Sequence, residues 1–440
     1  MRTGRIFIAL IFAIGLTGVI VDGAALYSRF LFISILLTVI AWAWTRWVIN
    51  RLTLERSSRQ LRANVGDVFE EGYKLNNNGV LPAPWVEVIN RSGLPEAAGS
   101  RLLTLVMGRQ MRSYTARSWV TRRGSFQLGP TRILTGDPFG LFRAVKEISP
   151  NETLIVFPMI HEIQSFPSPP GLLPGGQVIR TRSQDITPHA AGVREYVHGD
   201  AMKRIHWPTS VRRNRLMVKE FEQDPQAEVW IYLDCQRTAH FERRSQHEEE
   251  ITMPAMLLAK RPKLKLPPST FEYSVSIAAS LAHYFIGQRR AVGFASAGLP
   301  FTELPAERSE RQEAKILETL AFVEANGNLS IAALVAAQSS LHPQRSSIIL
   351  VTPTTRPDLL QAVDDLLMRY LSPVVVLLDA HTFGGPTSPE NIVNSLHERR
   401  VPVCVVSCDA DLSLVLSSIS TTLKTQDFSA WQTPALSPSI

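Results

Sequence analysis

The chain has few cysteines and few charged residues for its length, and both shortages exclude some classes of site and fold. Three of its 440 residues are cysteine (Cys235, Cys404 and Cys408), and none has the CxxC or Cys/His spacing of a zinc site. So sparse and odd a count fits a reducing compartment better than a disulfide scaffold. Charged residues make up 19% of the chain against 45% hydrophobic residues, and the apolar surplus is concentrated in the first 49 positions.

Charge is nearly absent from two long N-terminal runs. Residues 6–21 contain no charged side chain, and the apolar run that begins with residues 30–43 continues past them with one charge, Arg46. Each run approaches the roughly 20 residues that a helix needs to cross a bilayer. We therefore expect residues 1–50 to form a transmembrane helical hairpin, closed by a loop at residues 22–29.

Basic residues predict the orientation of this hairpin. Arg2 and Arg5 precede its first helix, and positive charge at both outer ends of a hairpin places both ends in the cytoplasm. A cleaved signal peptide is the alternative, but no small-residue cleavage site precedes the second apolar run. The sequence thus predicts a two-pass protein of the cell membrane, embedded in the lipid bilayer, with both termini and the soluble domains in the cytoplasm. The arginines beyond the second run are Arg46, Arg51, Arg56, Arg59 and Arg62.

Residues 51–160 have a pattern of short strand-like runs between turn signals. Candidate strands at 85–89 and 113–116 predict a small all-β sandwich. The stretch 101–123 holds six arginines and no acid, and the whole chain carries a formal charge of +7. One interpretation is a surface that binds nucleic acid. The other, which we favour, is the solvent face of alternating strands, so nucleic acid is not an expected partner.

From residue 227 the pattern changes to continuous apolar runs that alternate with amphipathic stretches. This alternation predicts a parallel sheet covered on both faces, and we expect a doubly wound α/β domain over residues 227–425. Residues 161–226 form a Pro/Gly-rich connector and a polar-aromatic segment, residues 236–270 a mobile loop, and residues 426–440 a disordered tail. The expected strands are 228–233, 291–294, 347–351, 373–378 and 401–406, and the expected helices are 271–290, 310–324, 330–340, 358–371, 390–399 and 411–419.

The polar-aromatic segment carries a specific resemblance. Its run of Arg-Glu-Tyr, Gly-Asp, Ile-His-Trp and Val-Lys-Glu-Phe-Glu resembles the signature of the bacterial family called domain of unknown function fifty-eight. In that family the run precedes a von Willebrand factor A-like α/β domain, and members look like partners of MoxR-type AAA+ ATPases. The resemblance implies such a fold and such a partner, but no established reaction, and Val211 departs from the alanine that is usual there. The signature residues are Arg194, Glu195, Tyr196, Gly199, Asp200, His206, Trp207, Ser210, Arg212, Lys219 and Glu220.

The signature segment has two physical interpretations. In the first it is structural or a docking surface: Asp200 caps a short helix from Ala201, Trp207 and His206 hold the segment in place, and arginines at 212–215 face outward. In the second, His206 is a general base oriented by Asp200 or Glu195. No nucleophile or second ligand stands at a diagnostic spacing, so the first is preferred.

Asp234 ends the first expected strand of the α/β domain. A von Willebrand A domain places an Asp-x-Ser-x-Ser metal site there, and ligands do bind at the carboxyl ends of parallel strands. Here the run keeps oxygens at Asp234 and Thr238, but Gln236 replaces the first serine and Arg237 adds a cation. Mg²⁺ needs hard oxygens in near-octahedral array, and this set is thin even if Asp379 were to substitute. We expect a degenerate site without a cofactor, with weak Mg²⁺ binding at Asp234 as the alternative.

These observations favour a non-enzymatic, membrane-anchored scaffold or adaptor whose cytoplasmic α/β domain binds partner proteins. By resemblance the partner would be a MoxR-type AAA+ ATPase system. The alternative is a metal-dependent hydrolase that uses Asp234, Asp200 and His206, and a third reading is a nucleic-acid-binding membrane protein. Convergence of His206 with Asp234 in one pocket would favour the enzyme, whereas burial of His206 against Trp207 would favour the scaffold.

Overall fold

A computed structural model divides the chain into two compact units. The first contains residues 1–159, and the second contains most of residues 160–440. The structure describes residues 2–21, 23–95, 97–149, 152–167, 190–197, 202, 205–221, 228–243 and 265–419. The predicted C-terminal tail, most of the Pro/Gly-rich connector and much of the predicted loop at 236–270 lie outside these residues.

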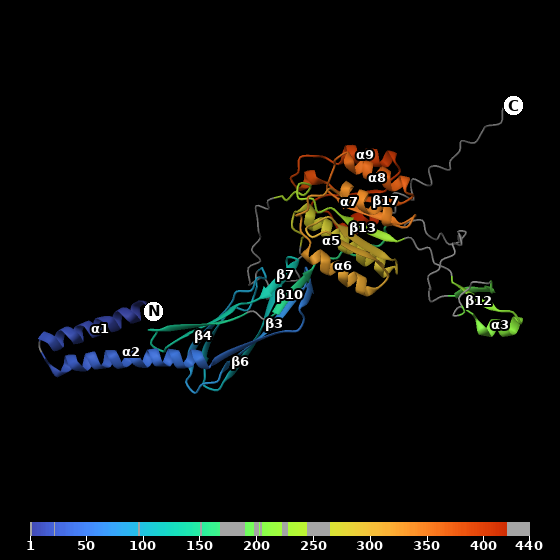
Figure 1. Cartoon of the computed structure of the whole chain (residues 1–440). Helices are drawn as coiled ribbons and strands as arrows, with labels where there is room; N and C mark the ends of the chain where they lie inside the picture. The colour runs from blue at the N-terminus through green and yellow to red at the C-terminus, as the bar shows by residue number, and fades with distance from the viewer. Residues whose placement is uncertain are drawn as a thin grey trace, which may run out of the picture. The chain divides into compact units, whose positions relative to one another are not determined.

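Two apolar helices open the first unit. Helix α1 (Arg2–Val21) and helix α2 (Ala25–Arg51) lie side by side (Figure 1, blue). Both are long and apolar enough to cross a membrane, and large apolar side chains such as Phe7, Ile20 and Phe32 are more than 60% exposed. The loop predicted at 22–29 is wrong in length: the chain turns at Gly23, whose φ is 65°, and α2 already begins at Ala25 because no residue from Ala25 to Arg29 breaks a helix.

The end of α2 belongs to the core of the β-rich region that follows. Val48 and Ile49 are buried there, and β1 (Leu52–Ser58) begins directly after the helix. The predicted domain boundary at residue 50 thus lies within the last turn of a helix that packs into the next part of the chain. Because Val48 and Ile49 are anchored in this core, the second apolar helix cannot rotate independently of the strands.

Three sheets form the β-rich region. Among the described residues from 61 to 158 there is no helix, as predicted. The strand orders of the three sheets are β1-β3-β6, β2-β10-β7 and β5-β4-β8-β9. Tyr73 and Leu75 of the first sheet share a core with Val86 and Ile133 of the third, so these two sheets face each other. The other strands are β2 (Arg62–Asn64), β3 (Val68–Asn77), β4 (Ala83–Asn90), β5 (Arg101–Val106), β6 (Met111–Trp119), β7 (Gly124–Leu128), β8 (Thr131–Gly136), β9 (Arg143–Ile148) and β10 (Glu152–Phe157).

The second unit contains a six-stranded sheet in the order β15-β14-β13-β16-β17-β18. All neighbours are parallel except the pair β14 and β15. Every residue of β13, β14 and β16 is buried, which explains why these strands read as continuous apolar runs. The strands are β13 (Val229–Leu233), β14 (Val292–Ser296), β15 (Thr302–Glu307), β16 (Ser347–Thr352), β17 (Ser372–Leu378) and β18 (Val403–Val406).

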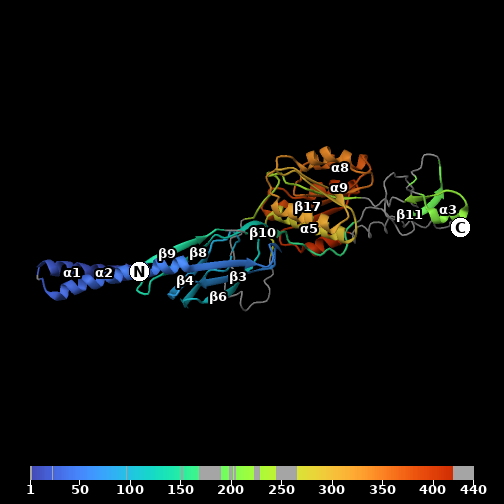
Figure 2. The same ribbon diagram turned by 60° about the horizontal axis from the view of Figure 1, so that its bottom comes forward.

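Helices cover both faces of this sheet. Side chains of α7, α8 and α9 share a core with Trp230, Tyr232 and Leu350, while α5 packs against β13, β14 and β16 (Figures 1 and 2). The predicted helices at 271–290, 310–324, 330–340, 358–371 and 390–399 are present with shifted ends. They are α5 (Thr270–Gly287), α6 (Glu310–Phe322), α7 (Ile331–Gln338), α8 (Asp358–Met368) and α9 (Glu390–Glu398), with short 3₁₀ helices η2 (Ser339–Leu341) and η3 (Ala380–Phe383).

Strand β15 was missed in the sequence. Its residues alternate between half-buried and exposed, as expected of an edge strand with one covered face. Pro305 is tolerated there because proline is confined to edge strands and bulges. The Thr-Glu-Leu-Pro-Ala-Glu run has the alternation of a strand, but its proline and its two acids are more typical of a loop, so the sequence did not predict a strand there.

Candidate functional site

The signature segment folds as a strand pair closed by one short helix. Strand β11 (Ala190–Glu195) pairs antiparallel with β12 (Met217–Phe221), and α3 (Trp207–Arg213) lies in the connection between them. Asp200 and Ala201, where the sequence predicts a cap and the start of a short helix, lie outside the described residues. Helix α3 begins at Trp207, because Pro208 fits the first turn of a helix, where its missing N–H is not needed.

Ser210 holds α3 against β12. Its hydroxyl donates to the carbonyl of His206 at 3.0 Å and accepts the backbone N–H of Met217 at 2.8 Å. Ser210, Met217, Val218 and Ile205 are all buried and make up the small core of the segment. The serine of the signature is therefore explained by the structure: it satisfies backbone groups where helix and strand meet.

His206 precedes α3 and is half-buried. Its backbone N–H donates to the carbonyl of Met217 at 2.8 Å, and its Nδ1 lies 2.8 Å from the hydroxyl of Thr209. Glu195, one of the two predicted orienting acids, instead forms an ion pair with Arg215 at 2.7 Å. Among the described residues, the side-chain partner of His206 is thus a hydroxyl, and Asp200, the other predicted orienting acid, lies outside them.

Trp207 is exposed, which contradicts the prediction that it holds the segment in place. Its side chain is 62% exposed and Val211, one turn later on the same face, is 77% exposed. Burial falls instead on Ser210, the buried residue of α3, and on Ile205 and Met217 outside the helix. Three other apolar side chains of the segment are also exposed: Val197, Met202 and Leu216.

Basic side chains adjoin this apolar surface. Arg212 and Arg213, in the last turn of α3, are exposed and form no ion pair with a described residue. The outward position predicted for the arginines at 212–215 is therefore confirmed for these two, while Arg215 is engaged by Glu195. Tyr196 is half-buried and donates its backbone N–H to the carbonyl of Leu216. Gly199 and Asp200 lie outside the described residues, as do the side chains of Arg194, Lys219 and Glu220.

Asp234 lies in a separate site at the carboxyl end of β13. Its carboxylate is 1% exposed and accepts hydrogen bonds from the hydroxyl of Thr352 at 2.6 Å and the backbone N–H of Gln236 at 2.9 Å. Burial raises the pKa of Asp234 to about 6, although both hydrogen bonds act to lower it. Its backbone carbonyl accepts from Nε2 of His240 at 3.0 Å, and burial lowers the pKa of that histidine to about 4.

The Asp234 site lacks the ligands of a metal centre. Thr238 is exposed, and Thr352 takes the place beside the carboxylate that Thr238 was predicted to share. Asp379 accepts the backbone N–H of His381 and begins η3, so its carboxylate serves another element. No group of three or more His, Cys, Asp or Glu side chains with metal-binding spacing occurs within the described ranges. What the site does chemically is tie the ends of β13 and β16 together.

The roles of Thr352 and His240 were not assigned from the sequence. Thr352 had a signal, because it ends an apolar strand next to the one that Asp234 ends, and such ends meet at one edge of a sheet. His240 lies six residues beyond Asp234 with no periodic relation to it, and only the folded turn between them brings its ring back to the Asp234 carbonyl.

Comparison with known proteins places the signature segment in a family. Residues 192–261 match the family described as "Protein of unknown function DUF58". An uncharacterized protein of Bacillus subtilis (strain 168), YeaD, is 24% identical over 282 residues, which cover 61% of this chain and 62% of the relative. The chain therefore matches less than two thirds of the length of this relative.

Solved structures offer only weak likenesses. The CARDB domain of the PF1109 protein from Pyrococcus furiosus, solved with di-metal ions, matches 24% of this chain and 91% of that domain at 15% identity, with a TM-score of 0.18. A β-glucosidase from Listeria innocua with isofagomine matches 24% of this chain and 16% of the enzyme at 13% identity and a TM-score of 0.14. Neither score supports an argument about fold or activity. The resemblance seen in the signature residues is confirmed by the family match, in which residues 192–261 of this chain match the DUF58 family.

Proposed function

We propose that this chain is a non-enzymatic membrane adaptor that docks a partner protein on its soluble part. The two N-terminal helices would anchor it as a two-pass protein with the soluble units in the cytoplasm. The resemblance of the signature segment suggests a MoxR-type AAA+ ATPase as the partner. The proposal rests chiefly on one observation, the exposed apolar surface of α3 beside two exposed arginines, Arg212 and Arg213, that form no ion pair with a described residue.

The composition of this surface is typical of a binding site. Tryptophan and arginine are the residue types most enriched among the hot spots of protein interfaces. Trp207 and Val211 form an apolar stripe, and Arg212 and Arg213 place positive charge next to it. Soluble proteins rarely expose contiguous apolar surface without a use for it. The signature segment therefore supports a partner that presents an apolar groove rimmed by acidic side chains.

The α/β unit supports a von Willebrand A-like, doubly wound fold as part of this proposal. Its first strand, β13, lies in the middle of the sheet, and helices cover both faces. Asp234 ends that strand, as the metal-binding acid of such domains does, but its carboxylate is bonded to Thr352. A carboxylate that is engaged in this way fits an adaptor that does not use a metal at this edge of the sheet.

The arginine-rich stretch of β5 and β6 gives less support to a nucleic-acid partner. Arg117 is paired with Glu70 at 2.8 Å, and the guanidinium of Arg101 lies over the ring of Tyr114. Charges that are engaged within the β-rich region are less available to phosphates. Protein, rather than nucleic acid, is accordingly the partner class that we propose.

A capture experiment tests the docking surface. The detergent-solubilised full chain would be immobilised, and the purified MoxR-type ATPase of the same organism passed over it with and without nucleotide. We expect the double variant Trp207→Ala/Val211→Ala to lose at least tenfold in affinity, since hot-spot truncations cost about 2 kcal/mol or more. Arg212→Ala/Arg213→Ala should mainly slow association and weaken its salt dependence.

Matched controls come from the α/β unit. Met368 and Leu414 are 74% and 68% exposed, so Met368→Ala and Leu414→Ala remove similar apolar surface elsewhere. They should leave capture unchanged. Equal loss in the control variants would mean that the ATPase recognises exposed apolar surface in general, and unchanged capture by both double variants would refute docking at α3.

A further inference from the structure

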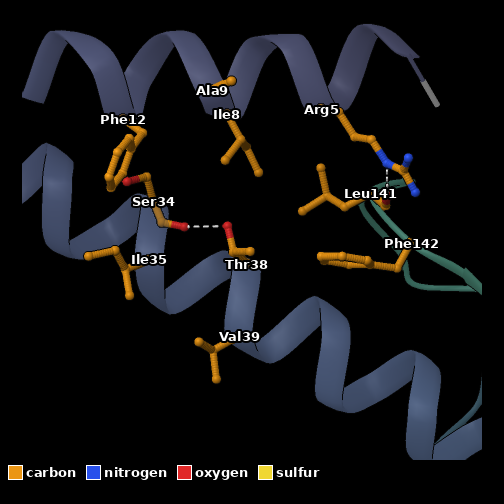
Figure 3. A pocket seen from close by; sticks show the side chains of 10 residues that line it. All are labelled: Arg5, Ile8, Ala9, Phe12, Ser34, Ile35, Thr38, Val39, Leu141 and Phe142. Carbon is orange, nitrogen blue, oxygen red and sulfur yellow. Dashed lines mark hydrogen bonds between the residues drawn. The ribbon is translucent and has the colours of Figure 1, made fainter.

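We propose that the helical hairpin holds one phospholipid at a fixed site, with an acyl chain between α1 and α2 and the phosphate on Arg5. The site is a cavity of about 400 Å³ that lies wholly within the first unit (Figure 3). Its walls come from three elements, namely α1, α2 and the loop between β8 and β9. The lining residues are Arg5, Ile8, Ala9, Phe12, Ser34, Ile35, Thr38, Val39, Leu141 and Phe142.

The packing of the hairpin explains why a cavity exists. At the loop end, α1 and α2 touch through glycines: a Cβ at Gly15 would lie 2.8 Å from the backbone nitrogen of Leu31, and one at Gly18 would lie 2.2 Å from the ring of Tyr27. Toward the start of α1 the small residues give way to Ile8 and Phe12, and the loop residues Leu141 and Phe142 close the end (Figure 3). Helices in tight contact at one end and propped apart at the other leave a wedge between them.

The wall of the wedge is suited to hydrocarbon. Ser34 and Thr38 are its hydroxyl-bearing residues, and each donates its proton within α2, to the carbonyls of Leu31 at 2.9 Å and Ser34 at 2.7 Å. An apolar cavity does not retain water, and an empty one would forfeit dispersion contacts along its whole lining. Within a bilayer the molecules at hand to fill it are acyl chains, which makes a lipid the occupant that we commit to.

Arg5 supplies the charge complementarity for a head group. Its Nε donates to the carbonyl of Leu141 at 2.6 Å, and its guanidinium lies 5.9 Å from the centre of the Phe142 ring. These two contacts fix the side chain at the mouth of the wedge, while its terminal nitrogens make no hydrogen bond to a described residue. Guanidinium N–H groups bind phosphate oxygens with bidentate geometry. The spacing of an acyl slot and a fixed cation fits an anionic phospholipid.

The loop that presents Leu141 and Phe142 is itself built to be rigid. The carboxylate of Asp137, 1% exposed, accepts the backbone N–H groups of Phe139 at 2.8 Å and Leu141 at 3.2 Å. It also accepts the N–H of Phe142 at 2.5 Å. Three backbone bonds to one buried carboxylate hold the end of the wedge in place whether or not a lipid is present.

Photo-crosslinking tests the acyl slot. The full chain would be reconstituted in nanodiscs of phosphatidylcholine that contain a trace of phosphatidylglycerol with a diazirine near the end of one acyl chain, and labelled peptides would be mapped by mass spectrometry. We expect labels to concentrate on residues 8–12 and 35–39. The cavity-filling variants Ile8→Trp and Thr38→Phe, one from each helix, should each reduce this labelling severalfold, whereas Ile6→Trp, at a 64% exposed position outside the lining, should not.

Competition between lipids tests the contact of Arg5 with an anionic head group, because phosphatidylglycerol has a net negative charge and phosphatidylcholine has none. Arg5→Gln should lower the preference for phosphatidylglycerol over phosphatidylcholine by about fivefold, the contribution of one basic residue near anionic lipid. Arg29→Gln, which removes the same charge at the start of α2, should leave the preference in the slot unchanged. Labels spread evenly along both helices, or unaffected by both filling variants, would overturn the site. Labels that follow the filling variants but not Arg5→Gln would overturn the head-group contact alone.

Discussion

At the scale of single residues, the most informative side chain in the α/β unit is Asp234. A carboxylate that is 1% exposed and bonded to a neighbouring threonine is a structural group, not an open ligand. The bond from Thr352 joins two parallel strands at their carboxyl ends. Burial has displaced the acid toward its neutral form, which weakens it as a metal ligand near neutral pH.

The raised pKa of Asp234 predicts a specific pH dependence of stability. Because its pKa is about 6 in the folded chain against 3.8 for an ordinary aspartate, the protonated form favours folding. The resulting stability is fully present below pH ~4 and is lost as the pH rises through about 6. Asparagine does not ionise, so the Asp234→Asn variant should keep this stability as the pH rises. Between pH 4 and 7 its free energy of unfolding should therefore increase by about 3 kcal/mol relative to that of the wild type. Urea unfolding of the solubilised full chain at stepped pH measures the difference.

His240 also changes its charge between pH 4 and 7, so its effect on stability must be distinguished from that of Asp234. Its pKa is lowered to about 4 by burial, so its contribution is lost as the pH falls below 6.5, the opposite direction. Since both proteins in the comparison contain His240, its effect cancels. A stability difference that does not change with pH would show that Asp234 is ionised in the folded chain over the whole range.

At the scale of elements, the signature segment depends on Ser210 more than on its conspicuous aromatic residue. We expect Ser210→Ala to leave the N–H of Met217 without a partner and to destabilise the contact of α3 with β12 by about 1–3 kcal/mol. Hydrogen–deuterium exchange should therefore accelerate over β12. Trp207→Ala should change local protection little, because surface substitutions are within about 0.5 kcal/mol.

A neighbouring hydroxyl provides the control for this prediction. Thr209 is half-buried, and the one described residue that its side chain bonds is His206, so Thr209→Ala should leave β12 protected. The opposite result would be wild-type exchange in Ser210→Ala and lost protection in Trp207→Ala. It would mean that Trp207 holds the segment in place, as the sequence alone suggested, and that its exposed position is wrong.

At the scale of the whole molecule, the anchor and the β-rich region are one mechanical piece. Helix α2 is continuous from its apolar run to Val48 and Ile49, which lie in the β core, and β1 follows without a linker. The apolar part of the hairpin is thus joined rigidly to the first sheet.

The arginine distribution predicts the side of the membrane on which the soluble units lie. A full-length fusion with alkaline phosphatase after Ile440 should be inactive, and one with green fluorescent protein should be fluorescent, because both outer ends of the hairpin are expected in the cytoplasm. Replacing Arg46 and Arg51 by glutamine should weaken this bias, with Arg356→Gln/Arg369→Gln in the α/β unit as the charge-matched control. High phosphatase activity of the unaltered fusion would reverse the topology.

What the sequence alone determined is what depends on periodicity along the chain. Two apolar runs that approach 20 residues, the second with one charge at Arg46, predict spanning helices. Continuous Val/Ile/Leu runs between amphipathic stretches predict β13, β16 and β17 in a sheet buried on both faces, because burial on two faces removes the alternation that one-sided strands show. The signature residues likewise identified the DUF58 segment, since a motif is read from order and spacing.

What only the tertiary structure decided is which face of an element is used. In a seven-residue helix, Trp207 and Ser210 are three positions apart and so are neighbours on its surface, and the sequence cannot say which of the two packs against β12. The partner of Asp234 is likewise Thr352, 118 positions away, rather than Thr238 four positions away. The wedge between α1 and α2 also depends on a loop more than a hundred residues later. Such contacts join residues distant along the chain, so they arise from packing and leave no period in the sequence.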